Sequence, residues 1–329
     1  MSHKLTIVSM FSGCGGFDLG AKQTGTEIIW ANDIDSYAGI AYKTLLPEAE
    51  FVLGDVRNIK EFPKADILIG CYPCTGFSLG ARRRWHDLQE RNLRANKNNF
   101  LYREFLRALR QIRPKYFFVE NVKGMTSAED GWFFERQLGG FRRHGYKVKW
   151  AQLNACDYGV PQSRKRVFIV GVRNEKGAMK YEFSNPTHGP NGIKPHISLR
   201  DVIGDMERWP HGDYFDYPFH GHFLTRNRKR SWDEVSYTIV ADAHHVPLHP
   251  MGKPMVFIAK DLWTLQGRSN RRLSWRECAY IQGLPPRIFS KIGLVEKYRV
   301  IGNAVPPALG KVLLEPVVNF EATKQKRQY

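Results

Sequence analysis

Two cysteines in a C-x-x-C arrangement, Cys71 and Cys74, follow the short apolar run of residues 66–70. A thiol directly after a buried strand, in front of a glycine-containing loop, is well placed for nucleophilic catalysis. The same spacing permits a redox pair or half of a zinc site, and either thiol could be an inert core residue. A thioredoxin-like fold is smaller, and zinc would require further ligands, for which the sequence has no second C-x-x-C. Nucleophilic catalysis is therefore the leading interpretation.

The cysteines as a group indicate reduced thiols. There are five, an odd number, and they are scattered along the chain at Cys14, Cys71, Cys74, Cys156 and Cys278. An odd, scattered set in a chain without an export signal argues against a disulfide framework.

A carboxylate and a pair of arginines occupy similar positions next to apolar strands. Glu120 follows residues 116–119, all of them aromatic or aliphatic, and such surroundings can make a carboxyl group available as a proton donor. Arg164 and Arg166 are two apart on an extended segment and therefore point to the same side. Taken alone, Glu120 is a structural ion-pair partner and the arginines are surface charge. Beside a thiol and a carboxyl group, the two arginines could bind an anion or a carbonyl group.

A glycine-rich loop follows the first apolar run. Gly13, Gly15 and Gly16 allow a sharp turn and a close approach of the backbone to a ligand, although the full G-x-G-x-x-G dinucleotide motif is missing. Asp33 follows the second run, and Asp55 follows a further short run; at such places carboxylates can accept hydrogen bonds from a ribose or an adenine edge. Each acid alone could be part of a solvated turn. Together they predict a ligand that contains adenosine.

The elements that must position these residues alternate between strands and helices. Apolar runs predict strands at residues 5–11, 27–31, 66–70, 116–119 and 167–172. Helical patterns cover residues 36–46, a segment from about 99 that stops before Pro114, residues 274–282, and a final segment from Pro307. Strands that alternate with helices predict a doubly wound, mostly parallel α/β sheet, in which ligands bind at the carboxyl ends of the strands.

The texture changes near residue 181, where histidine, proline, glycine, arginine and aromatic residues replace the strand–helix rhythm. We therefore expect a larger domain made of residues 1–180 and 292–329, which binds the cofactor, and a smaller, irregular, β-rich domain made of residues 181–291.

Composition limits the class of protein. Fifty Lys and Arg against 32 Asp and Glu give a net charge of +18, which favours a polyanionic partner such as nucleic acid. No apolar run approaches the roughly 20 residues that span a bilayer, and the start lacks the layout of a signal peptide. We expect a soluble, cytoplasmic protein with no membrane partner.

The order of these motifs resembles that of bacterial DNA cytosine-5 methyltransferases, from about Met10 to Pro307. Each motif is short and weak alone, but the ordered set is specific to that family. The set comprises F-x-G-x-G-G at residues 11–16, Pro73-Cys74, Glu120-Asn121-Val122, Gln162-x-Arg164-x-Arg166, Arg272-Leu273-Ser274-x-Arg276-Glu277 with Gln282-Gly283, and Gly302-Asn303-Ala304-Val305-Pro306.

The resemblance implies a fold, a reaction and roles for residues. The larger domain would have the class I S-adenosylmethionine-dependent methyltransferase fold. Cys74 would attack C6 of a cytosine, Glu120 would hydrogen-bond N3, Arg166 would contact O2, and Arg164 would support the thiolate. S-adenosylmethionine would supply the methyl group for C5 and leave as S-adenosyl-L-homocysteine. Its site would comprise Phe11, Gly13, Gly15, Gly16, Asp33, Ile34, Asp55, Val56, Pro73 and Asn303.

The resemblance also implies that the target base leaves the duplex, because C5 and C6 cannot be reached within the stack. Residues 75–99 would form the loop that closes over the flipped base, with Ser78, Arg82, Arg83 and Arg84 at the DNA. Solvated charge is the alternative interpretation of the three arginines. The chain departs from the family at Thr75, where glutamine is usual, which affects the packing of the loop and not the reacting atoms.

Target recognition would belong to residues 181–291. The segments 225–232 and 237–250 resemble those of enzymes that methylate GGCC, and Arg226 and Arg228 would each read a guanine edge. Those enzymes usually carry arginine where this chain has His244, so a different or relaxed recognition site is also open.

The expected partner is double-stranded DNA, the expected state is a monomer, and no metal is expected. A restriction-modification system is the expected setting. Two alternatives remain: a tRNA cytosine-5 methyltransferase on the same scaffold, which is marked by a Cys-Phe-Thr motif that this sequence lacks, and a DNA-binding homologue without catalysis.

Overall fold

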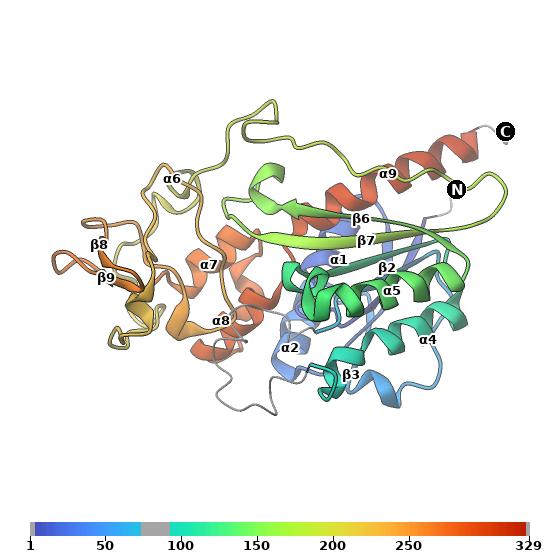
Figure 1. Cartoon of the computed structure of the whole chain (residues 1–329), viewed down its shortest axis with the longest axis horizontal. Coiled ribbons are helices and arrows are strands. Elements are labelled where there is room, and N and C mark those ends of the chain that lie inside the picture. Colours follow the sequence, from blue (N-terminus) through green and yellow to red (C-terminus); the bar gives the residue numbers. More distant parts are fainter. Residues whose placement is uncertain (1–3, 74–92, 327–329) are drawn as a thin grey trace.

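The structure is a computed structural model that describes residues 4–73 and 93–326. Among these residues a seven-stranded sheet, in the order β3-β2-β1-β4-β5-β7-β6, forms the centre of the molecule (Figure 1). The strands β3, β2, β1, β4 and β5 run parallel, whereas β7 is antiparallel to both β5 and β6. This confirms the predicted doubly wound, mostly parallel sheet. The strand bounds are β1 Thr6–Met10, β2 Glu27–Asp33, β3 Glu50–Leu53, β4 Ile67–Gly70, β5 Tyr116–Val122, β6 Tyr146–Asn154 and β7 Lys165–Arg173.

The sheet is covered on both faces because its side chains alternate between two hydrophobic clusters. In β1, Ile7 belongs to one cluster and Val8 to the other. The cluster of Ile7 also contains residues of α1 (Gly16–Lys22), α2 (Ser36–Leu45), α7 (Trp275–Gln282), α8 (Leu294–Asn303) and α9 (Pro307–Lys326). The cluster of Val8 contains residues of α4 (Tyr102–Ile112) and α5 (Trp132–Arg143).

The five expected strands and the four expected helices are present, and their ends agree to within a few residues. Two strands were missed. β3 is short, and β6 lies at the sheet edge, where exposed residues such as Lys147 and Gln152 are interspersed with partly buried ones. An edge strand meets solvent and therefore lacks the continuous apolar run that identified the central strands.

The chain between β7 and α7 is mostly irregular. It contains the short helix α6 (Leu199–Ile203) and a hairpin of β8 (Val256–Ala259) with β9 (Leu262–Thr264), which projects at the end of the molecule far from α9 (Figure 1). The region therefore has less strand than a β-rich domain would have. A small cluster of its own surrounds Phe223 and Leu248, whereas Leu199 and Ile239 belong to the main core. The boundary at residue 181 remains a prediction.

Two glycines of α1 allow this helix to pack closely on the chain near α9. A Cβ atom on Gly16 would lie 2.2 Å from the carbonyl oxygen of Val305, and one on Gly20 would lie 2.0 Å from that of Pro307. Side chains at either position would push α1 away from residues 304–311. None of the helices in the described ranges is both long enough and apolar enough to cross a bilayer.

Candidate active site

A cavity of about 750 Å³ opens at the carboxyl ends of β1, β2, β4 and β5. This is the edge at which open α/β sheets bind ligands. One wall consists of residues 11–14 after β1 and residues 33–35 at the end of β2, and a second consists of residues 71–73 after β4 and 120–122 at the end of β5. The C-terminal part of α8 and the following turn, residues 299–300 and 302–305, form a third wall, and Arg164 and Arg166 complete the lining.

The acidic wall of the cavity is ordered by Asp33. Its Oδ2 accepts a hydrogen bond from the Gly13 amide at 2.8 Å, and its Oδ1 accepts one from the Asp35 amide at 2.9 Å. Burial raises the pKa of Asp33, and the backbone amides oppose that shift. Each oxygen retains capacity for a second donor. Asp33 therefore links the loop after β1 to the end of β2 and can still accept hydrogen bonds from a ligand.

Apolar side chains lie next to this carboxylate. Ile34 lines the cavity with 69% of its surface exposed, which is unusual for a large aliphatic side chain. Phe11 also lines it, with a left-handed backbone (φ 55°) and its ring edge-on to Tyr72 at 6.1 Å. Strained backbone of this kind concentrates at ligand sites. Both side chains offer apolar surface to a ring system of a ligand.

Six of the expected cofactor residues line the cavity: Phe11, Gly13, Asp33, Ile34, Pro73 and Asn303. The other four, Gly15, Gly16, Asp55 and Val56, are not among the described residues of its wall. Gly16 is the point at which α1 contacts Val305, and Gly15 begins α1 with a left-handed backbone (φ 84°).

Asp55 and Val56 are instead part of a turn. Asp55 caps η1 (Val56–Asn58) and forms an ion pair with Arg57, whose guanidinium lowers the pKa of this carboxyl. The side chain of Val56 is buried in the cluster under α4 and α5. These contacts give both residues structural roles, and their contact with the ligand remains a prediction.

Glu120 and Arg166 form an ion pair on neighbouring strands. The Arg166 Nε lies 2.9 Å from the Glu120 Oε1, and only 16% and 12% of the two side chains are exposed. The antiparallel pairing of β5 with β7 sets this contact, because Val122 pairs with Arg166 and Glu120 with Phe168. Burial lowers the pKa of Arg166, and the Glu120 carboxylate opposes that shift. The sequence analysis placed these residues at one site, and both line the cavity.

Arg164 is buried and holds two segments of the backbone together, in addition to its expected role beside the thiolate. Its guanidinium donates to the carbonyl oxygens of Ile239 at 3.1 Å and Gly302 at 3.0 Å, which ties the start of β7 to α8. Its Nε has no hydrogen-bond partner within the described part of the chain. Arg164 lines the cavity, so this donor is a candidate for a ligand or a bound water.

Cys74 lies outside the described residues, but the chain reaches it directly from the cavity, because Pro73 lines the wall. Cys71 also lines the wall. Burial, followed by the Glu120 carboxylate, raises the pKa of the Cys71 thiol well above its usual value. Since the thiolate is the nucleophile, this environment argues against Cys71 as the attacking group.

The predicted DNA contacts have different outcomes. Ser78, Arg82, Arg83 and Arg84 lie outside the described residues. Arg226 is exposed on an extended backbone. The side chain of His244 is half-exposed, bonded to Asp242 and edge-on to Phe215 at 4.6 Å.

Arg228 corrects the sequence interpretation. Its side chain is buried, and its guanidinium donates to the carbonyl oxygens of Phe223 at 2.7 Å and His245 at 3.0 Å. It also stacks over the Phe223 ring at 4.4 Å, and burial lowers its pKa to about 10. Because the guanidinium already serves backbone acceptors, Arg228 supports the fold of this region and does not present a fork to a base.

The sequence analysis missed the buried cations that hold residues 181–291 together. Arg271 forms a two-bonded, fully buried ion pair with Glu277, and Arg272 donates to carbonyl oxygens of Tyr217 and His244. Lys229 donates to three oxygens, and burial lowers its pKa to about 8. The Ser274-x-x-Glu277 capping box was the available signal, but nothing in it identifies Arg271 as the partner.

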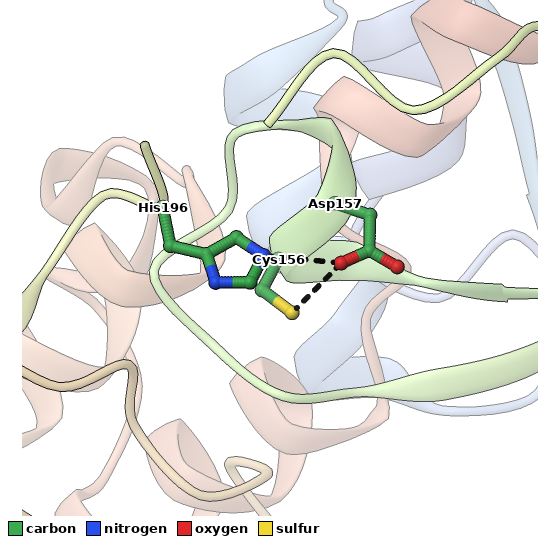
Figure 2. A group of neighbouring side chains, drawn as sticks. All are labelled: Cys156, Asp157 and His196. Atoms are coloured by element: carbon green, nitrogen blue, oxygen red, sulfur yellow. Dashed lines mark hydrogen bonds and ion pairs between the residues drawn. The ribbon is translucent and has the colours of Figure 1, made fainter. Parts of the chain in front are cut away.

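Cys156, Asp157 and His196 form a group away from the cavity that could in principle hold a metal ion (Figure 2). The Asp157 Oδ1 lies 3.5 Å from the Cys156 Sγ and 3.1 Å from the His196 Nε2. These distances are those of hydrogen bonds, and Asp157 and His196 are each about one-third exposed. The group fastens the segment around His196 to the turn before β7, and we assign it no metal.

Comparison with known proteins identifies the family. The family model for C-5 cytosine-specific DNA methylases matches residues 5–319. The type II methyltransferase M.BsuRI of Bacillus subtilis is 37% identical over 97% of this chain and 80% of its own length. M.BspRI of Lysinibacillus sphaericus is 38% identical over 98% and 83%.

The fold has relatives among solved structures. A DNA modification methyltransferase encoded within an Escherichia coli prophage superimposes with a TM-score of 0.71, at 19% identity, over 97% of this chain and 100% of that one. The Dnmt2 protein of Spodoptera frugiperda gives 0.64 at 18% identity, over 96% and 100%. The sheet is consistent with the class I methyltransferase fold. The chain therefore belongs to the C-5 cytosine-specific DNA methylase family and is a DNA (cytosine-5) methyltransferase.

Proposed function

We propose that this cavity holds S-adenosylmethionine and a cytosine flipped out of duplex DNA, and that Cys74 attacks the base there. The Glu120–Arg166 pair carries the proposal. It is a largely buried pair of a carboxylate and a guanidinium, and it lines the same cavity as Pro73, the residue before Cys74. A buried ion pair in a cavity is a common sign of a functional site.

The lining residues fit the cofactor. The volume of about 750 Å³ is within the usual range for small-molecule sites, roughly 300–1,000 Å³. Asp33 keeps acceptor capacity for ribose hydroxyls, and Phe11 and Ile34 offer apolar contacts to an adenine ring. When bound, S-adenosylmethionine supplies an electrophilic methyl group on a positively charged sulfur and leaves as S-adenosyl-L-homocysteine.

The residues of this chain prepare the base. The Cys74 thiolate adds to C6, which moves electron density toward C5, a position that is otherwise a poor nucleophile. Glu120 hydrogen-bonds N3 and is held in place by the Arg166 Nε. The Arg166 NH1 donates to the Lys165 carbonyl oxygen, and its NH2 is the candidate donor to the O2 of the base. After methylation, a base from solvent takes the C5 proton, the electrons of the C5–H bond re-form the C5–C6 double bond, and the C6–S bond breaks to release the Cys74 thiolate.

On the DNA side, the base must leave the stack, and basic residues contact the backbone. The net charge of +18 supports binding to phosphates. Residues 181–291 form the recognition domain, with Arg226 and His244 as its candidate base readers. Catalytic and recognition regions lie in one chain, and we propose that it acts as a monomer. The relatives named type II methyltransferases support a place in a restriction-modification system.

The test is methyl transfer from labelled cofactor to separate pools of duplex DNA and tRNA. We expect label on DNA, no label with Cys74→Ala, and normal label with Cys156→Ala, which alters a thiol outside the cavity. A duplex containing 5-fluorocytosine should trap the parent protein and not Cys74→Ala. Label on tRNA alone would contradict the DNA assignment, and turnover by Cys74→Ala would place the nucleophile elsewhere.

Bisulfite sequencing of DNA from cells that express the chain identifies its recognition sequence. Methylation confined to GGCC would agree with the resemblance of segments 225–232 and 237–250. A different short sequence would agree with the departure at His244.

A further inference from the structure

An ion pair joins two walls of the cavity that are far apart in the sequence. Arg299 is on α8 and Asp35 caps the start of α2, and the two helices lie beside each other (Figure 1). The guanidinium contacts both carboxylate oxygens: NH2 lies 3.1 Å from Oδ1, and NH1 bonds to Oδ2. Both residues line the cavity.

Asp35 is well placed to transmit this contact. Its Oδ1 also accepts hydrogen bonds from the amides of Tyr37 at 3.0 Å and Ala38 at 3.3 Å, so the same carboxylate fixes the first turn of α2. Its own amide donates to Asp33, whose other oxygen holds the Gly13 amide. A continuous series of bonds therefore runs from Arg299 through Asp35 and Asp33 to the loop after β1.

The far end of α8 is fixed separately. Gly302 accepts a hydrogen bond from Arg164, and the Gln282 side-chain amide donates to the carbonyl oxygens of Ile301 and Ala304. These bonds hold the end of α8 to Arg164 and Gln282 but do not reach the segment 33–35. The Arg299–Asp35 pair connects α8 to that segment.

We propose that Arg299 and Asp35 are positioning residues that hold the two walls at the separation the cofactor requires, so that their pairing sets the affinity for S-adenosylmethionine. The proposal rests on the proposed function, since it presumes that the cavity takes this cofactor. Neither residue needs to touch the ligand: Asp35 acts through the Asp33 carboxylate, and Arg299 through Asp35.

The contribution of the pair should be modest, because 40% of the Arg299 side chain and 17% of the Asp35 side chain are exposed. Loss of a partly exposed ion pair should therefore weaken the affinity by up to about fivefold. The bonding to both carboxylate oxygens requires a guanidinium, so lysine should restore only part of the effect.

The experiment measures the dissociation constant of S-adenosyl-L-homocysteine by calorimetry on the full chain, without DNA. Arg299→Gln should weaken binding about fivefold, and Asp35→Asn should do the same, since asparagine retains the helix cap but loses the charge. The double variant should bind no more weakly than either single one, because both remove one interaction. Arg299→Lys should lie between the parent and Arg299→Gln.

Arg276→Gln is the matched control. Arg276 also projects from a helix, pairs with an aspartate, Asp213, and has a similar exposure of 48% against 22%, but it does not line the cavity. It should lower thermal stability about as much as Arg299→Gln while leaving the affinity unchanged. An Arg299→Gln protein with parental affinity would overturn the proposal, as would independent, additive losses in the double variant.

The remaining outcomes are also decisive. If Arg299→Gln weakens binding and Asp35→Asn does not, Arg299 contacts the ligand itself and the positioning role is wrong. If the parent protein binds no S-adenosyl-L-homocysteine, the proposed cofactor site fails first. If the parent binds and methylates DNA but both variants bind normally, only the role of this pair fails.

Discussion

Replacing Glu120 by glutamine should separate the catalytic use of the Glu120–Arg166 pair from its structural use. The substitution keeps the shape of the side chain and removes its charge, so the Arg166 cation is left in a site where burial already lowers its pKa. Removing one partner of a fully buried pair costs roughly 3–5 kcal/mol. Because the two side chains keep 16% and 12% of their exposure and face a cavity, we expect a smaller loss, about 2–3 kcal/mol of unfolding free energy.

For the double variant Glu120→Gln, Arg166→Met we expect the unfolding free energy to recover. This variant removes the uncompensated charge and replaces it with an apolar chain, so most of the lost unfolding free energy should return. Methyl transfer should not return. We expect kcat to fall by roughly 10²–10⁴-fold in both proteins, the usual range for loss of a positioned acid or base.

Stability is measured by urea denaturation and activity by label transfer to DNA under the same buffer conditions. Glu182→Gln is the control, because Glu182 pairs with Lys149 on the surface and should leave the urea midpoint unchanged. A Glu120→Gln protein as stable as the parent would refute the reasoning about the buried charge. A double variant that remained as unstable as Glu120→Gln would do so as well.

Three further predictions concern other charged groups. Arg228→Ala should lower the unfolding free energy by roughly 2–4 kcal/mol, because two carbonyl oxygens lose a charged donor. Arg226→Ala should weaken discrimination at one base pair by roughly 1–3 kcal/mol in competition binding; equal weakening on all sequences would make it a phosphate contact. Burial raises the pKa of Asp18 to about 6 in the folded protein. As pH rises from about 4 to 6, the Asp18 carboxyl therefore ionises in the unfolded chain before it ionises in the folded one. Unfolding free energy should fall by roughly 3 kcal/mol across that window, and a parallel fall in Asp18→Asn would assign it to other groups.

The central strands could be predicted from sequence because a strand buried on both faces needs a continuous apolar run. Residues 67–70 and 116–119 are examples, and both are buried throughout. β6 could not be predicted in this way, since at the edge of the sheet only part of its surface is covered. The antiparallel direction of β7 was also not predicted, because direction is a property of the connection and leaves no periodicity in the strand.

Within the site, local signals identified residue types and tertiary structure decided their partners. The sequence placed Glu120 and Arg166 at one site through motif order, but the 2.9 Å contact depends on the register of β5 with β7. Gly16 and Asp55 belong to motifs that suggest ligand contact, and only the structure shows that Gly16 also packs α1 and that Asp55 also pairs with Arg57.

The sequence by itself determined the central strands, the reactive residue types and the family, because apolar periodicity and short motifs are local properties of a chain. Only the tertiary structure decided which cations are buried and which walls are joined. Arg226 and Arg228 are two residues apart and look alike in sequence, but one lies at the surface and the other beneath Phe223. Arg299 and Asp35 meet across 264 residues, and no local pattern records a contact that exists only after the two helices have packed.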